Sequence, residues 1–184
     1  MPAIAADVVG FWTAAGPSKW FAKSPIFDEA IRLKFEPTHH YAALGRYMAW
    51  AETPQGALAL MILLDQFPRN LYRGTGHAYA TDPLARSIAR RALDAGHDQA
   101  SPPQMRPFFY LPFSHSEDAA DQDLSVALFE AHDAATGDFD SLKWAGIHHD
   151  IIQRFGRFPH RNLSLGRDST PEELAFMEEG DFAG

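Results

Sequence analysis

The stretch ALALMILLDQFPRNLYR, from Ala57 to Arg73, decides the fold of this chain. Residues 57–64 are apolar throughout, and their Ala, Leu and Met content favours a helix. A helix that is apolar all round lies in a protein interior, and this run is far shorter than the roughly 20 residues needed to cross a bilayer. The next turn is polar, with Asp65 and Arg69 at its two ends. The sequence therefore predicts a buried central helix that ends in a polar cluster.

The composition sets the limits for the rest of the chain. With 184 residues, of which 46% are hydrophobic, we expect one domain over residues 1–184. The net charge of −8 argues against binding to nucleic acid or to an anionic membrane surface. The chain has no Cys, which excludes disulfides and thiolate chemistry. Residues 1–14 lack a basic leader, so we do not expect a secretory signal. We expect a cytoplasmic location instead.

Apolar residues at helical spacing, together with capping and breaking residues, predict the helices of the first half. A first helix begins near Ile4 and ends near Gly16, a second carries Phe27 to Phe35 and stops at Pro37, a third carries Tyr41 to Ala51, and the central one starts after Thr53. The central helix should end near Gln66, because the residue before Pro68 is biased away from the helical region.

The second half follows the same pattern. A fifth helix starts at Asp82 and ends before Gly96, and a loop covers residues 101–111. A sixth helix follows a capping box of Ser114 and Glu117 and runs to about Thr136. A seventh helix ends at Gly156, and a short last helix begins at Thr170. No stretch alternates as a strand would. We therefore predict an all-α fold of about seven or eight helices, stacked as antiparallel hairpins.

One short pattern occurs twice. FPRNL at residues 67–71 is matched by FPHRNL at residues 158–163, with His160 as an insertion. Each copy follows the end of an apolar helix and is followed by a further Arg, Arg73 or Arg167. The similarity predicts that the two loops meet and form one site.

Three motifs resemble a bacterial family of uncharacterised proteins, known as domain of unknown function 924. They are LLDQFPRNLYRGT at residues 63–75, HSED at 115–118 with Gln122 and Ser125 behind it, and RFGRFPHRNLSLGR at 154–167. The resemblance implies a fold like that of tetratricopeptide helical hairpins. It implies no activity, since it brings no catalytic residues with it.

The candidate site consists of polar residues in or next to these motifs. They are Asp65, Arg69, Asn70, Arg73, His115, Glu117, Asp118, Gln122, His148, Arg154, Arg157, His160, Arg161, Asn162 and Arg167. In one interpretation the Arg side chains pair with carboxylates and hold loops against helix ends, as in a scaffold. In the other, the local excess of Arg binds an anionic small molecule or peptide.

An enzyme acting on a phosphate or carboxylate substrate is the alternative function. A metal-dependent phosphohydrolase would use His115, His148, His149 and Asp150. Such metals favour carboxylate-rich surroundings, whereas these motifs are rich in Arg. We therefore expect no bound metal and no organic cofactor, and the sequence leaves the oligomeric state open.

Overall fold

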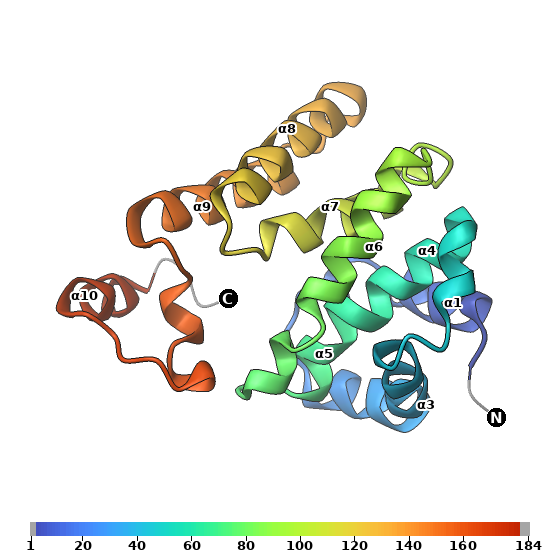
Figure 1. Ribbon diagram of the computed structural model, residues 1–184, viewed down its shortest axis with the longest axis horizontal. Helices are drawn as coiled ribbons and strands as arrows, with labels where there is room; N and C mark the ends of the chain where they lie inside the picture. The colour runs from blue at the N-terminus through green and yellow to red at the C-terminus, as the bar shows by residue number, and fades with distance from the viewer. Residues whose placement is uncertain (1–2, 181–184) are drawn as a thin grey trace. The chain divides into compact units, whose positions relative to one another are not determined.

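The computed structural model describes residues 3–180, and this part of the chain contains helices and turns but no strand (Figure 1). The predicted all-α class is confirmed, while the tetratricopeptide-like stacking stays a prediction. The chain groups into two compact units. Unit 1 takes in the chain up to Arg73 together with His77–Pro112, and unit 2 takes in Gly74–Gly76 and the chain from Phe113. The expected single domain also stays a prediction.

Unit 1 opens with three helices of very different length. They are α1 (Ala5–Ala15), α2 (Pro17–Trp20) and α3 (Pro25–Ala43). Ser24 caps α3 by accepting a hydrogen bond from the main-chain N–H of Phe27.

The prediction that a helix stops at Pro37 is wrong, because α3 continues through this residue. Proline removes the N–H that the carbonyl of Leu33 would accept. Both residues are exposed, so water can supply the missing donor on this side of the helix. The predicted third helix is accordingly wrong as well: Tyr41 belongs to α3, and Ala51 lies in the short turn η1 (Met48–Glu52).

The central helix is buried as predicted, but it does not end at Gln66. Three segments follow one another without a break: α4 (Pro54–Met61), the π-type turn η2 (Ile62–Gln66) and α5 (Phe67–Leu71). In the π turn the N–H of Phe67 bonds the carbonyl of Ile62, five residues back. Pro68 then occupies the first turn of α5, where a missing N–H is tolerated.

Helices of unit 1 surround this central segment. In Figure 1, α1, α3 and the later helix α6 (Asp82–Asp94) lie around α4 and α5, and the residue contacts agree: α1 and α6 pack on α4, and α3 packs on α5. The rest of the unit includes most of the turn η3 (Gly76–Tyr79), the turn η4 (Pro103–Met105) and most of α7 (Pro107–Ser114). The last helix replaces the second part of the loop predicted at residues 101–111, from Pro107 onward.

Aromatic rings fill the core of unit 1. Phe67, the first residue of the FPRNL copy, is fully buried, and its ring centroid lies 5.6 Å from that of Trp12 and 5.1 Å from that of Phe35. Trp12 also packs edge to face on Phe108 at 5.8 Å. The Phe of the motif is therefore a packing residue.

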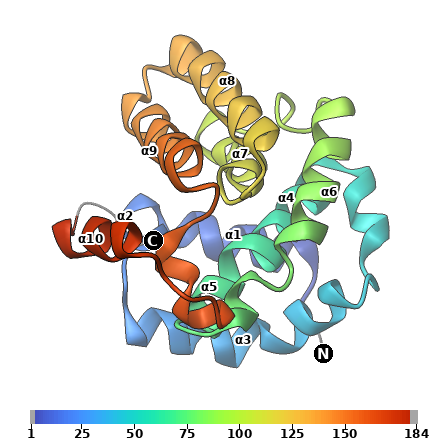
Figure 2. The ribbon, with the colours of Figure 1, turned by 60° about the vertical axis from the view of Figure 1, so that its left-hand side comes forward.

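Unit 2 is built on a helical hairpin. Figure 2 shows α8 (Ala119–Thr136) and α9 (Phe139–Phe155) side by side, followed by α10 (Pro171–Glu179). Gly137 and Gly156 end the two long helices with φ of 74° and 67°, as predicted. Between α9 and α10 lie the short turns η5 (Pro159–Arg161) and η6 (Leu163–Leu165). Among residues 3–180, no helix combines the length and the apolar character needed to cross a membrane.

Candidate functional site

In unit 1, the π turn leaves main-chain carbonyls that distant side chains satisfy. His39, on α3, bonds the carbonyl of Leu63 through Nδ1 at 2.8 Å. The carbonyl of Leu64 would normally accept from the N–H four residues on, which Pro68 lacks, and the hydroxyl of Thr81 donates to it instead. Burial lowers the pKa of His39. The side chains of α3 and of the segment before α6 thus complete the hydrogen bonding of this helix.

Asp65 lies at the centre of the same turn and is fully buried. Its carboxylate accepts from Nε2 of Gln66 at 2.6 Å and lies 3.6 Å from Nη1 of Arg69. Arg69 also donates to the carbonyl of Asp65 and forms two parallel bonds to Asp82, at 2.9 and 3.0 Å. Burial lowers the pKa of Arg69, but Asp82 and Asp65 more than offset this and raise it. Arg69 therefore stays charged and joins α5 to the start of α6.

A second carboxylate of unit 1, Asp28 on α3, binds the end of the FPRNL copy. Asn70 donates from Nδ2 to Asp28 at 2.8 Å. Arg73 donates from Nε and Nη2 to both oxygens of Asp28, at 3.1 and 3.0 Å. One carboxylate thus receives the Asn of the motif and the Arg that follows it.

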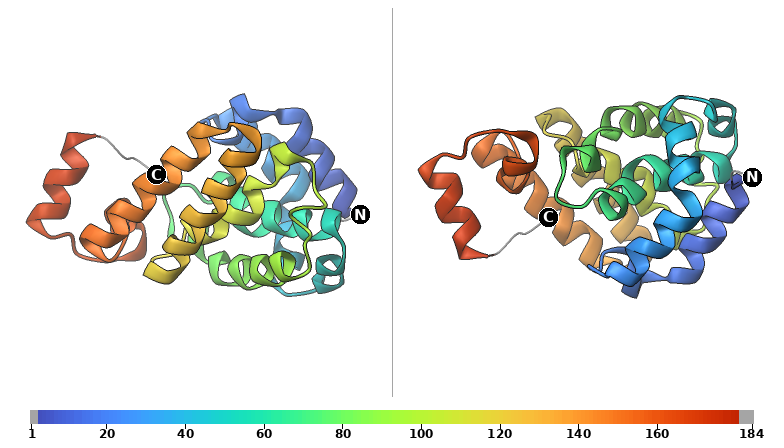
Figure 3. Two further views of the ribbon diagram at one scale, coloured as in Figure 1. Left: turned by 90° about the horizontal axis from the view of Figure 1, so that it is seen from above. Right: turned by 90° about the horizontal axis from the view of Figure 1, so that it is seen from below.

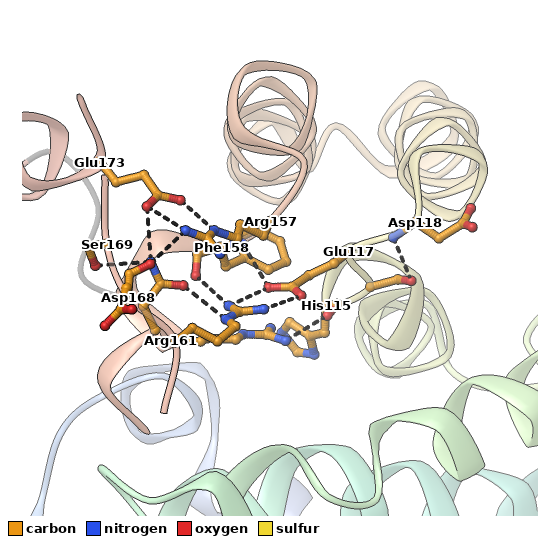
Figure 4. A network of polar contacts seen from close by, with 12 residues as sticks. His115, Glu117, Asp118, Arg157, Phe158, Arg161, Asp168, Ser169 and Glu173 are labelled. Atoms are coloured by element: carbon orange, nitrogen blue, oxygen red, sulfur yellow. Dashed lines mark hydrogen bonds and ion pairs between the residues drawn. The ribbon is translucent and has the colours of Figure 1, made fainter. Parts of the chain in front are cut away.

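In unit 2, Glu173 on α10 has the corresponding role (Figure 4). Arg157 donates from Nε and Nη2 to its two oxygens, at 2.6 and 2.8 Å, and Asn162 donates from Nδ2 at 3.2 Å. Glu173 also closes a capping box with Thr170, where only a helix start was predicted, and accepts from the N–H of Thr170 at 2.7 Å. These bonds, that of Arg157 first, lower the pKa of Glu173 to about 2.

Glu117 is a second carboxylate of unit 2 that receives bonds from an Arg. Arg167 donates from Nη1 and Nη2 to its two oxygens, at 2.7 and 2.9 Å, and the N–H of Phe158 donates at 2.8 Å. Burial raises the pKa of Glu117, but the bonds from Arg167 and Phe158 lower it overall. Arg167 also donates from Nε to Oδ1 of Asn162 at 3.0 Å, so one side chain links Glu117 to the second motif copy.

Arg161, the Arg of the second copy, lies against an aromatic ring. Its guanidinium is 4.5 Å from the ring centroid of Phe158, and Nη1 donates to the carbonyl of His115 at 3.0 Å (Figure 4). The rings of His148 and His160 also pack on Phe158, each at 5.6 Å between centroids. This part of unit 2 therefore combines histidines with a buried guanidinium.

Two polar residues of the HSED region serve helix ends. Gln122, fully buried, donates from Nε2 to the carbonyls of Ser114 and Ser116, at 2.8 and 2.6 Å, and so caps the end of α7. Asp118 is the N-cap of α8. The prediction of a capping box formed by Ser114 and Glu117 is therefore wrong, because Asp118 occupies the capping position.

The residues proposed for a metal do not form one cluster. His149 bonds Asp123 through Nε2 at 3.0 Å and lies 3.6 Å from Asp150, both exposed. Within residues 3–180, no group of three or more His, Asp or Glu is arranged to hold a metal ion. Arg154 pairs at the surface with Glu172, at 3.0 Å.

The structure thus places nine of the fifteen candidate residues in two clusters, together with three carboxylates that were not candidates. We call the first, in unit 1, the Arg69 cluster: Asp28, Asp65, Arg69, Asn70, Arg73 and Asp82. We call the second, in unit 2, the Arg167 cluster: Glu117, Arg157, Arg161, Asn162, Arg167 and Glu173. The meeting of the two loops concerns the placement of one unit against the other and stays a prediction.

The carboxylates Asp28, Asp82 and Glu173 were not among the predicted site residues. Asp28 lies next to the aromatic pattern of the early helix, and the other two were interpreted only as helix-start signals. A carboxylate in the first turn of a helix is typical of capping, so the sequence gives no separate signal that it also binds an Arg.

The chain belongs to the family described as bacterial protein of unknown function (DUF924), which it matches over residues 8–181. A solved structure of this kind is that of ATU0120 from Agrobacterium tumefaciens, a protein of unknown function. The two sequences are 51% identical, and the match covers 96% of this chain and 97% of the ATU0120 chain. The two structures superimpose with a TM-score of 0.90. No curated protein matches this chain.

Proposed function

We propose that this protein is a binding or scaffold domain in which the Arg clusters hold its own loops together. One observation carries the proposal: four Arg side chains each form two parallel bonds to one carboxylate. The pairs are Arg69 with Asp82, Arg73 with Asp28, Arg157 with Glu173 and Arg167 with Glu117.

Paired bonds of this geometry use the same donors that a guanidinium would offer to an anionic ligand. A phosphate or carboxylate ligand entering such a site would have to displace a carboxylate of the protein. That carboxylate is tethered, and Asp82 and Glu173 are almost fully buried, so removing it from its Arg is unfavourable. The pairing therefore favours a structural role for these four Arg side chains.

Each pair also joins elements that are distant in sequence. Asp82 begins α6 and Asp28 lies on α3, whereas their partners Arg69 and Arg73 lie in α5 and just after it. In unit 2, Glu173 on α10 fastens the segment behind α9. Loops tied in this way present rigid helix surfaces, which is what a scaffold requires.

An anion site in the Arg167 cluster is the second candidate function. Arg161 and Arg167 both lie near Glu117 in this cluster, and the rings of His148 and His160 pack on Phe158 beside Arg161. In this candidate function the guanidinium of Arg161, which lies against the Phe158 ring, contacts an anionic small molecule or peptide. The same place would serve an enzyme acting on an anionic substrate.

Thermal unfolding with inorganic phosphate separates the two candidates. Phosphate stabilises most proteins weakly through exclusion from their surface, so the matched control is the variant Arg161→Gln at the same phosphate concentration. For a scaffold, phosphate raises Tm equally in both proteins and without saturation. A saturable rise in the wild type that Arg161→Gln abolishes would overturn the scaffold role in favour of an anion site.

A further inference from the structure

One face of α3 carries an apolar stripe that no part of unit 1 covers. Figure 3, right, shows α3 in blue across the near side of unit 1, with no other helix of that unit in front of it. The large side chains on this face are strongly exposed: Ile26 86%, Leu33 78%, Leu44 72% and Tyr41 40%. We call this face, together with Ala30 and Pro37, the α3 stripe.

The members of the α3 stripe share one side of the helix because of their spacing. They follow one another at intervals of three or four residues, the period of one helical face. The opposite face carries Phe27, Ile31 and Phe35, which are buried in the core. A surface helix normally presents polar residues outward, so α3 is apolar on both sides.

We infer that the α3 stripe binds a second copy of this chain, with the two α3 helices side by side and parallel. This inference names a partner for the scaffold proposed above and in that sense rests on it. The exposed surface is of the right extent: the four large side chains expose on the order of 500 Å², as large as the main apolar patch on a typical monomer. Two such faces would bury about 1,000 Å², the size of a weak, transient interface.

The charges at the borders of the stripe select the second copy and its direction. Glu29 lies on one border, 3.5 Å from Arg32 of the same helix, and Lys34 lies on the other, 5.3 Å from the ring centroid of Phe11; both residues are exposed. In a parallel pair related by a twofold axis, the border with Glu29 faces the partner's border with Lys34, so opposite charges meet twice. In an antiparallel pair each border faces its own equivalent, which brings Glu29 and Glu36 against the same acidic border.

The oligomeric state tests the inference directly. Sedimentation equilibrium of the full chain, from about 1 to about 500 µM, should give a reversible dimer of the weak class expected for a small interface. Leu33→Glu should raise the dissociation constant at least about tenfold, because it places a charge in the contact on both copies. The matched control is Leu163→Glu, which alters a residue that is 94% exposed in unit 2 and should leave the constant unchanged.

Charge reversal tests the direction of pairing. Glu29→Lys and Lys34→Glu should each weaken the dimer, and the double variant should recover it, because the two opposite-charge contacts are rebuilt. A double variant as weak as the sum of the single changes would overturn the parallel arrangement.

Cysteine trapping gives an independent measure, since the chain has no Cys of its own. In a parallel pair Ala30 lies opposite Ala30, so Ala30→Cys should form a disulfide-linked dimer on mild oxidation. In an antiparallel pair centred on the stripe, residue 30 would face residue 40, and two copies of residue 30 would be about 15 Å apart. A link between Ala30→Cys and His40→Cys, with none in Ala30→Cys alone, would therefore overturn the inference.

The outcomes separate this inference from the proposed function. A wild-type protein that stays monomeric up to the highest concentration overturns the pairing and leaves the scaffold role standing. A saturable stabilisation by phosphate, lost in Arg161→Gln, overturns the scaffold role whatever the mass of the protein. Circular dichroism of each variant establishes that the altered surface residues leave the helices intact.

Discussion

The two copies of the Phe-Pro-Arg-Asn pattern produce the same side-chain arrangement on different backbones. In each, a buried Asn donates to a carboxylate that also receives two bonds from a neighbouring Arg. The groups are Asn70, Asp28 and Arg73 in unit 1, and Asn162, Glu173 and Arg157 in unit 2. Both copies therefore share an Asn–carboxylate contact, whereas the Arg that joins it follows the motif in unit 1 and precedes it in unit 2.

The backbones that carry this contact differ. The first copy is a helix, α5, that continues the buried central segment through a π turn. The second copy is a pair of 3-10 turns between two helices, and its carboxylate also closes the capping box of α10. The comparison teaches that a local sequence pattern can specify its polar contacts while the flanking helices determine the path of the chain.

The largest effect should come from the Arg69 cluster. Asp82→Ala should lower the free energy of unfolding by about 3–5 kcal/mol, because Arg69 would keep its charge in a mostly buried place without its paired acceptor. Urea denaturation measures this loss. Glu52→Ala is the control, since it breaks the exposed pair with Arg91 and should cost less than about 0.5 kcal/mol. A loss below about 1 kcal/mol for Asp82→Ala would show that this pair does not hold α5 to α6.

A smaller loss is expected in the Arg167 cluster. Glu173→Ala should cost about 2 kcal/mol, because Asn162 and the N–H of Thr170 lose their acceptor while Arg157 can turn into water. The adjacent Glu172→Ala, which affects only a surface pair, serves as the comparison in the same denaturation series. If Glu173→Ala costs as little as Glu172→Ala, the contacts of Glu173 do not stabilise unit 2 as the contacts of Asp82 stabilise unit 1.

The Asn residues rank next. Asn162 bonds Ser169, Glu173 and Arg167, whereas Asn70 bonds Asp28. We expect Asn162→Ala to cost about 2 kcal/mol and Asn70→Ala about 1 kcal/mol in urea. The reverse order would show that the number of hydrogen bonds does not determine the cost of losing each Asn.

The smallest effect is a difference in pH response. The pKa of His39 is lowered from 6.5 by burial, so the native state binds fewer protons than the unfolded chain, and stability should fall as pH drops below about 6.5. The pKa of Glu173 is lowered from 4.5 to about 2, so its contribution is complete above pH 4.5 and is lost between these two values.

Denaturation of His39→Asn and Glu173→Gln across pH separates the two windows. His39→Asn should flatten the stability curve just below pH 6.5, and Glu173→Gln should flatten it only below pH 4.5. An unchanged slope below pH 6.5 in His39→Asn would assign that loss of stability to another group.

Local signals predicted the ends of several helices correctly. Thr53 and Thr170 cap as expected, and Gly137 and Gly156 adopt the left-handed conformation that ends a helix. These features depend on residues within one turn, which a sequence displays directly. The burial of the central helix was also predicted correctly, because apolar residues on every side leave no face for water.

The errors at prolines arose from contacts that the local sequence does not contain. Pro68 is tolerated because Thr81, far along the chain, donates to the carbonyl that the proline leaves open. Pro37 is tolerated because it lies on the exposed side of α3. The carboxylate partners of the Arg residues were missed for the same reason: an Arg in the sequence indicates that a carboxylate lies nearby, but it does not identify which one.

The π turn at residues 62–66 also sets the angular phase of everything behind it. One residue turns a helix by about 100°, so the extra residue of the turn rotates α5 relative to α4 by roughly that angle. For α4 the angle is immaterial, since every side is buried, but for α5 it decides that Phe67 enters the core while Arg69 reaches α6. A deletion of one residue in this turn would rotate Phe67 away from the core and Arg69 away from α6 by about 100°, so the length of the turn is constrained as strictly as its composition.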